Sequence, residues 1–192
     1  TGASQPDELV RRAQALGYAA LAITDECSLA GVVRAHEEAV KLGLPLIVGA
    51  EMRLSPPPQA GARGSGPAEP AAPSGVGARL LLHAQSRRGY GNLAQWVTVA
   101  RRRAPKGQYQ AFASDLEGRV PRAPYLAGLP GCSALLVVDG PGDAAAPVFE
   151  TLFAQAMWLK TWFGADRAGL ALAVRHRVFD DEREAIARRL SA

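Results

Sequence analysis

The chain has 192 residues, of which 48% are hydrophobic, and it carries a formal net charge of +4 with a pI of about 9.4. This length and composition suit one globular domain with a hydrophobic core. Because no apolar run approaches the roughly 20 residues of a membrane span, we expect no membrane association; the mild positive charge permits a nucleic-acid partner without requiring one.

The two cysteines and the two ends of the chain bear on the expected cellular compartment and on the extent of the protein. Cys27 and Cys132 are far apart and form no CxxC pair, so we expect two small buried hydrophobes in a reducing cytoplasm. The first residues do not form a signal peptide. The absence of an initiator Met and the ending "IARRLSA" lead us to expect a piece of a longer protein.

Two helix–strand units open the chain. A capping box at residues 4–7 begins the first helix, Gly17 ends it, and the apolar run "YAALAIT" predicts a buried strand. We expect Ser28 to cap a second helix that ends at Gly43 before a second strand, "LPLIVGA". The residues expected on one side of that helix are Leu29, Val32, Val33, His36 and Val40.

The two units superimpose with an offset of 26 residues, which places Asp25 on Glu51. Right-handed crossovers make such strands parallel neighbours, so both acids should emerge at the C-terminal edge of one sheet. In a β/α barrel that edge carries the chemistry. The alternative is that Asp25 and Glu51 only cap the turns that follow them.

Residues 55–78 change the character of the chain, because twenty of these 24 residues are Pro, Gly, Ala or Ser. Such a segment cannot bury enough apolar surface to offset its ordering entropy. We interpret it as a flexible insertion within one domain, since strand and helix patterns resume after it.

The rest of the chain alternates between strand and helix patterns. Strands are predicted at residues 79–84, 134–138 and 169–174, and helices at 90–103, 149–163 and 180–190, with Phe149, Leu152, Phe153, Ala156 and Phe163 on the core side of the second of these helices. This alternation predicts an α/β fold with a parallel sheet. Arg101, Arg102, Arg103 and Lys106 could contact the phosphates of DNA, although a basic helix end is more often solvated.

Three segments carry a resemblance to a known family. The stretches "GASQPDELVRRAQALGYAALAITDECSLAGVVRAHEEA", "LPLIVGAEMRL" and "LLLHAQSRRGYGNL" resemble the PHP (polymerase and histidinol phosphatase) domain that opens the C-family bacterial DNA polymerases, in particular their error-prone, translesion branch. The resemblance implies that residues 1–192 are part of a distorted, TIM-like (β/α)7 barrel without its first and last strands. It also implies a cluster of up to three metal ions in active members.

The match to the family's metal ligands is incomplete. The resemblance implies that Asp25, Glu26 and Glu51 are remnants of the ligand cluster, with Glu26 in the place of a histidine. Thr1 replaces an Asp, Arg79 replaces a His, and Pro141 falls near a position where some relatives have a Cys. The family's opening His-x-His and final Asp-x-His would lie outside the chain.

We interpret this as a degenerate site in which the Arg79 guanidinium replaces the metal and binds the carboxylates. A surviving single-metal site, or no special arrangement, are the alternatives. His36 is expected to be a packed core histidine and His83 a structural residue. His176 follows a strand and could reach the top of the barrel, whereas Asp139 ends a strand without an identified partner.

The resemblance implies the PHP portion of an error-prone DNA polymerase that acts in damage-induced DNA repair, with this domain as a catalytically inactive scaffold. The longer polymerase would use Mg²⁺, whereas no cofactor is expected in this piece and Zn²⁺ or Mn²⁺ is not expected at the PHP site. Implied partners are DNA, the other polymerase domains, and the sliding clamp and mutasome proteins. The rival functions are an active metal-dependent phosphoesterase or proofreading exonuclease, and a stand-alone binding or regulatory module.

Overall fold

The computed structural model describes residues 4–56, 75, 77–138 and 149–172. Thr1, Asp139, Pro141, His176 and the helix expected at 180–190 lie outside the described residues, as does most of the expected insertion at 55–78. The near end of that insertion is anchored, because the Ser55 N–H donates to the Ala111 carbonyl. Its far end is buried at Ala78.

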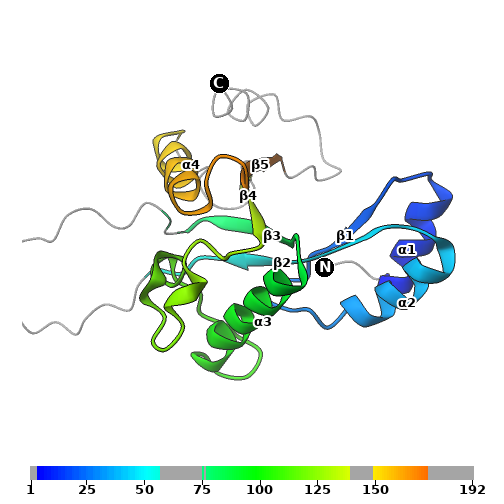
Figure 1. Cartoon of the computed structure of the whole chain (residues 1–192), viewed down its shortest axis with the longest axis horizontal. Coiled ribbons are helices and arrows are strands. Elements are labelled where there is room, and N and C mark those ends of the chain that lie inside the picture. The colour runs from blue at the N-terminus through cyan, green and yellow to red at the C-terminus, as the bar shows by residue number, and fades with distance from the viewer. Residues whose placement is uncertain (1–3, 57–74, 76, 139–148, 173–192) are drawn as a thin grey trace, which may run out of the picture.

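The described strands form one open sheet with the order β1-β2-β3-β4-β5, flanked by helices (Figure 1). The elements are α1 (Pro6–Ala15), β1 (Leu21–Ile23), α2 (Val32–Leu42), β2 (Leu46–Arg53), β3 (Arg79–Ala84), α3 (Arg87–Arg102), β4 (Cys132–Val138), α4 (Phe149–Phe163) and β5 (Ala168–Leu172). A π-helical turn at Asp115–Arg119 and a 3-10 turn at Pro124–Leu126 lie between α3 and β4. The α/β class is confirmed, whereas the partial TIM-like barrel that the resemblance implied is not, because the described sheet is open.

The prediction of a parallel sheet is wrong at β3. β1 pairs with β2 and β4 pairs with β5 in parallel, but β3 is antiparallel to both of its neighbours. Neighbouring parallel strands need a long crossover, usually a helix, whereas antiparallel strands can be joined by a loop. Residues 55–78 contain too few apolar residues to build a crossover helix, so β3 returns beside β2 in the opposite direction.

The register of β1 and β2 corrects the predicted repeat by one residue. Leu21 pairs with Leu46 and Ile23 with Val48, which is an offset of 25 rather than 26. An isolated parallel bridge then joins Glu26, and not Asp25, to Glu51. The two-unit pattern therefore identified neighbouring parallel strands correctly but selected the wrong carboxylate after β1.

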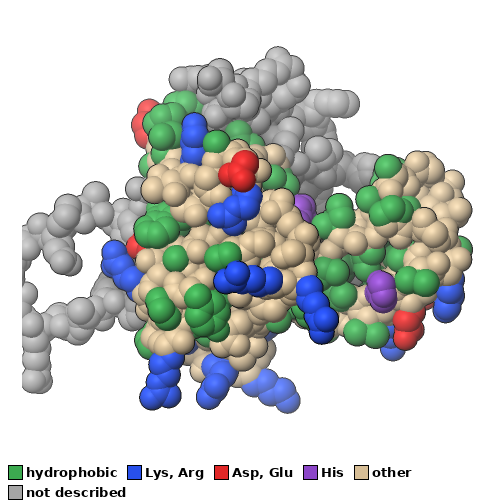
Figure 2. All heavy atoms as spheres, in the orientation of Figure 1, with side chains coloured by type: hydrophobic (Ala, Val, Ile, Leu, Met, Phe, Trp, Pro, Cys, Tyr) green, Lys and Arg blue, Asp and Glu red, His purple; other side chains and the backbone are tan. Residues whose placement is uncertain are grey.

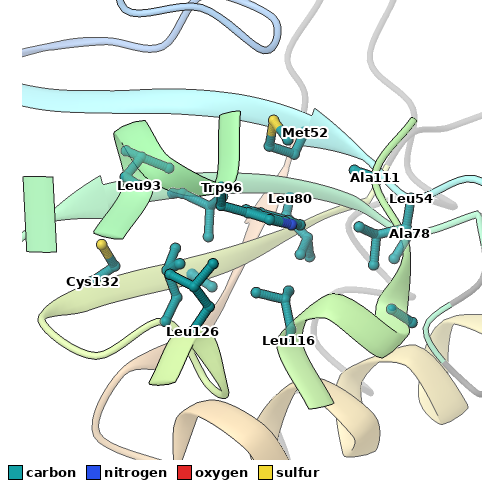
Figure 3. Packing of buried hydrophobic residues seen from close by; sticks show 14 of the residues in the cluster. Met52, Leu54, Ala78, Leu80, Leu93, Trp96, Ala111, Leu116, Leu126 and Cys132 are labelled. Carbon is teal, nitrogen blue, oxygen red and sulfur yellow. The ribbon is translucent and has the colours of Figure 1, made fainter. Parts of the chain in front are cut away.

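Two clusters of buried side chains hold the sheet and helices together. The larger cluster centres on Trp96 of α3, which is fully buried among Met52, Leu80, Leu93 and other residues (Figure 3). Burying each such large side chain contributes about 1.5–3 kcal/mol relative to leaving it exposed. The smaller cluster joins α1, β1 and α2 through Val10, Ala13, Ile23, Ala35, Ala39 and Leu44. The α1–β1–α2 lobe extends to one side of the sheet (Figure 1).

The predicted starts and core face of the first two helices need correction. The capping box of α1 is formed by Gln5 and Glu8, since the Gln5 N–H donates to Glu8 Oε2 at 2.8 Å. Gly31, rather than Ser28, precedes α2. The buried face of α2 consists of Ala35 and Ala39, whereas Val33, His36 and Val40 are exposed. Because Ala has no bulk beyond Cβ, this face lets α1 and α2 approach closely.

The expected core face of α4 is correct in part. Leu152 and Phe163 are buried, but Phe153 is 49% exposed and stacks on Phe149 with ring centroids 6.0 Å apart. Gln155 and Trp158 are buried instead. Among the described residues, the structure contains no helix with the length and hydropathy that crossing a membrane requires.

A close approach between α3 and the turn before β4 can be tested with two glycines of the same helix. A Cβ at Gly89 would overlap the carbonyl oxygen of Gly131, whereas a Cβ at Gly91 would meet nothing within 4 Å. We expect Gly89→Ala to lower the free energy of unfolding by about 1–3 kcal/mol through overpacking. Gly91→Ala should instead raise it by up to about 1 kcal/mol, because Ala favours the helix. Denaturant unfolding of both variants measures this, and equal effects would contradict the observed packing.

Candidate functional site

An ion pair between Arg79 and Glu51 lies where β2 and β3 meet. Arg79 Nε lies 2.5 Å from Glu51 Oε1, and Arg79 Nη2 lies 2.7 Å from Glu51 Oε2, so the guanidinium binds the carboxylate bidentately through the two donors of one edge. The two side chains are 20% and 16% exposed. In the antiparallel register Glu51 pairs with Leu81, so Arg79 is its diagonal neighbour on the same face of the sheet.

The second acid of the predicted cluster has a different partner. Glu26 pairs with Glu51 along the backbone, but its Oε1 accepts a hydrogen bond from the Tyr109 hydroxyl at 2.8 Å. The same hydroxyl accepts from the backbone N–H of Arg53 at 3.0 Å. Tyr109 therefore links the end of β1 to β2 and stabilises the Glu26 carboxylate without a second positive charge.

The environment of Tyr109 changes its acid–base behaviour. Burial is the main cause that raises the pKa of the Tyr109 hydroxyl to about 12; the Glu26 carboxylate acts in the same direction and the Arg53 N–H in the opposite one. Because the folded-state pKa lies above the ordinary value of 10, the stabilisation is complete below pH 10 and is lost as the pH rises from 10 to about 12. Tyr109 is therefore a donor to Glu26 at neutral pH.

Arg101 fastens the end of β1 to α3. Its Nε donates to the Cys27 carbonyl at 3.0 Å and its Nη2 to the Glu26 carbonyl at 3.2 Å. The guanidinium lies over the Tyr109 ring, 5.6 Å from the centroid. Glu26, Arg101 and Tyr109, with Gly107 and Gln108, line a cleft of about 380 Å³. The predicted DNA-contacting residue Arg101 thus makes several bonds within the protein.

Asp25 does not join this group of side chains. A Cβ placed on Gly31 would lie 2.8 Å from Asp25 Oδ2, so the Asp25 side chain lies against the residue that precedes α2. Among the described residues, no group of three or more His, Cys, Asp or Glu side chains is arranged to hold a metal ion. Only Glu26 and Glu51 of the three predicted acids come together, and each carboxylate accepts from a protein donor.

The adjacent arginines at the end of α3 have different roles. Arg103 binds Asp115 through two bonds of 2.7 and 2.8 Å, and Asp115 is 1% exposed. Asp115 also accepts from the Trp96 indole at 3.0 Å and the Phe112 N–H at 3.1 Å. Arg102 and Lys106 are exposed. Of the four predicted DNA contacts, two are therefore engaged inside the protein and two face solvent.

The remaining candidates are structural in their placement. His83 is half-buried in β3, and burial lowers its pKa, so the neutral form is favoured. Cys27 and Cys132 are buried free thiols, as predicted, and burial raises the pKa of both, to about 11 for Cys132. Tyr109 and Asp115 are not among the residues predicted from the sequence. Each follows α3 in a stretch with weak periodicity, and only their spatial partners distinguish them from ordinary loop residues.

Comparisons with known proteins give the family. The PHP domain profile matches residues 1–172. An error-prone DNA polymerase from Bordetella parapertussis is 47% identical over 180 residues, which cover 94% of this chain and 15% of the relative. The corresponding protein from Ralstonia nicotianae is 45% identical over 181 residues, covering 94% and 15%, and that from Methylococcus capsulatus is 43% identical over 159 residues, covering 82% and 12%. The chain thus spans only a small part of these relatives.

A solved structure has a similar fold. A protein from Bifidobacterium adolescentis, assigned as a metal-dependent phosphoesterase, superimposes with a TM-score of 0.60 over 99% of this chain and 80% of its own. The two sequences are 15% identical, so the likeness concerns the fold alone.

The Arg79–Glu51 pair should show energetic coupling. We expect Arg79→Met and Glu51→Gln each to lower the free energy of unfolding, because either change leaves a partly buried charge without this partner. The double variant should cost less than the sum, with a coupling of about 1–2 kcal/mol. Thermal or denaturant unfolding measures the cycle. The control cycle combines Glu51→Gln with Arg53→Met instead of Arg79→Met. Arg53 is exposed and pairs with Arg79 in the register of β2 and β3. That control should be additive, and additivity in both cycles would contradict the coupling.

Arg103 and Arg102 provide a second matched pair. Arg103→Met removes the bidentate partner of buried Asp115 and should cost about 3–5 kcal/mol of unfolding free energy. Arg102→Met changes an exposed neighbour and should stay within about 0.5 kcal/mol. Both variants are compared by denaturant unfolding. A mild effect of Arg103→Met would show that Asp115 does not depend on this cation.

Proposed function

Because the chain belongs to the PHP domain family, we propose that it forms the PHP-domain portion of an error-prone DNA polymerase and acts there as a structural scaffold. The observation that carries the proposal is the 47% identity to such a polymerase along 94% of this chain. In the longer protein the reaction would be templated addition of deoxynucleotides with release of pyrophosphate. The Mg²⁺ ions of that reaction would bind to residues outside this chain.

The proposed scaffold role rests on how the two acids are used. A metal cluster needs carboxylate oxygens that are free to coordinate, and imidazole ligands in this family. Both Glu51 oxygens accept from Arg79, and Glu26 accepts from Tyr109. A guanidinium at this distance would also repel a divalent cation. These residues do not fit a metal cluster, which supports a degenerate site in which Arg79 replaces a metal and needs no metal supply.

Their structural role follows from the same contacts. Arg79 ties β3 to β2, Tyr109 ties the segment after α3 to the end of β1, and Arg101 ties α3 itself to β1. The former ligand positions would therefore stiffen the junction of three strands and a helix. Such a rigid domain suits a platform for neighbouring polymerase domains.

The finer elements of the proposal concern the longer protein. For that protein we propose a role in damage-induced translesion synthesis, in the cytoplasm, with the sliding clamp and mutasome proteins as partners. The relatives' name, error-prone DNA polymerase, supports the polymerase part of this proposal. Completion of the sheet into a PHP-type barrel would require strands beyond β1 and β5. Each of these elements is open to direct test in the full-length protein.

A second candidate function is metal-dependent phosphoester hydrolysis. The observation in its favour is the shared fold with a protein assigned as a metal-dependent phosphoesterase. The pairing of Glu51 with Arg79 weighs against it, because the carboxylate that would bind the metal is already neutralised.

One experiment separates the two functions. The full-length natural protein should extend a primer with Mg²⁺ and deoxynucleotides, on undamaged and lesion-containing templates. It should not hydrolyse a generic phosphoester with Mn²⁺ or Zn²⁺. Hydrolysis that disappears in Glu51→Ala but persists in Glu37→Ala, an exposed control on α2, would establish the phosphoesterase instead. Failure to extend any primer would overturn the polymerase assignment.

A further inference from the structure

Positive charge is distributed unevenly along the described chain. Between Arg79 and Val138 there are nine Lys or Arg residues but only two acids, Asp115 and Glu117. Residues 4–56 contain five Lys or Arg residues and seven Asp or Glu residues. Both acids of the basic segment are in ion pairs, Asp115 with Arg103 and Glu117 with Arg119. The excess charge of this segment is therefore carried by residues at its surface.

The outer face of α3 collects part of this charge. Its exposed positions recur at helical spacing, and Figure 2 shows Lys and Arg side chains over the face of the molecule that α3 covers, with few acids among them. The exposed residues of α3 are Arg87, Arg88, Tyr90, Gly91, Gln95, Thr98 and Arg102, and Tyr90 is 44% exposed. α3 contains no acidic residue. The α3 face, defined by these seven residues, is about 22 Å long at 1.5 Å per residue, and exposed Lys106 follows its end.

The stability of the helix does not account for its first two arginines. The N-terminus of a helix carries a partial positive charge, so cations there are unfavourable and acids favourable. Arg87 and Arg88 nevertheless occupy the first turn. Within the described chain, none of Arg87, Arg88, Arg102 and Lys106 forms an ion pair, in contrast to Arg11, Lys41, Arg103 and Arg119. An external anion would relieve this repulsion.

The composition of the face indicates which anion. A protein interface normally has an apolar or aromatic centre, but the centre of the α3 face is Gly91, Gln95 and Thr98, and exposed Tyr90 lies at its edge. Gln and Thr side chains are common phosphate-contacting groups, together with Arg and Lys. A flat helix face of cations and small polar residues fits a repeating polyanion better than it fits an acidic, folded protein surface.

We propose that the α3 face binds the sugar–phosphate backbone of nucleic acid without reading its sequence, with Arg87, Arg88, Arg102 and Lys106 contacting phosphates. This corrects the earlier set of candidate contacts, because Arg101 and Arg103 are bound within the protein. The proposal does not require a polymerase active site. It can therefore fail while the polymerase assignment stands, and the reverse also holds.

The test measures binding of the full-length protein to a labelled oligonucleotide of random sequence, single- or double-stranded, by fluorescence anisotropy without nucleotides or metal. The variant is the triple change Arg87→Gln, Arg88→Gln and Arg102→Gln. We expect about tenfold weaker binding near physiological salt, and a slope of log affinity against log salt that is smaller by about 2–3, since each lost phosphate contact contributes about 0.7–0.9.

A charge-matched control removes three exposed cations from the α1–β1–α2 lobe through Arg12→Gln, Arg34→Gln and Lys41→Gln. Its affinity should change less than about twofold, and a Lys triple variant at the α3 positions should keep most of the binding because charge is preserved. Thermal unfolding verifies that all variants remain folded. An equal loss of affinity in the control variant would show that the effect depends only on net charge and would overturn the proposal. Unchanged binding by the Gln variant would also overturn it and leave the face to an acidic protein partner.

Discussion

The pairing of β1 with β2 makes two acidic residues neighbours, and several surrounding side chains stabilise their negative charges. The backbone bridge between Glu26 and Glu51 makes these residues neighbours. Glu51 is partly buried and Glu26 is exposed, and neighbouring negative charges repel each other less when each has a donor. Arg79 supplies one donor group and Tyr109 the other. Three elements distant in the sequence, β3, α3 and the segment after α3, therefore converge on the end of β1.

The antiparallel direction of β3 is what makes the ion pair geometrically available. In a parallel strand, the first residue would lie at the opposite edge of the sheet from the end of β1. Because β3 runs the other way, its first residue, Arg79, pairs with Arg53 and lies diagonally from Glu51. The low apolar content of residues 55–78 and the position of the cation that follows them are thus linked. Because β3 is antiparallel to β2, its first residue places the guanidinium next to Glu51.

The three arginines at the end of α3 show how position around a helix divides one basic run into separate functions. Successive residues of a helix differ by about 100° in direction. Arg101 therefore turns inward to the carbonyls at the end of β1, Arg102 faces solvent, and Arg103 reaches buried Asp115. A basic run in a sequence is one electrostatic feature. In the fold, Arg101 binds backbone carbonyls, Arg102 is a surface charge, and Arg103 forms an ion pair with buried Asp115.

The sequence by itself determined the local features whose physics is contained in a short segment. The ends of α1 and α2 at Gly17 and Gly43, the apolar strands, and the helix–strand–helix repeat follow from backbone conformation and hydrophobic patterning within a few residues. The Arg79–Glu51 pair was also predictable, but through resemblance to a family and not from spacing. What the pattern could not supply was the one-residue register of β1 on β2, because both offsets place apolar residues in the strands.

Only the tertiary structure decided which faces are buried and which charges have partners. In α2 the larger side chains Val33 and Val40 predicted the core face, yet Ala35 and Ala39 face α1, because the space between two close helices admits only small residues. Asp115 is buried because Trp96, Phe112 and Arg103 supply donors from three directions. Glu26 binds Tyr109, 83 residues away. Burial and pairing are properties of what the folded chain brings together, and no local pattern contains them.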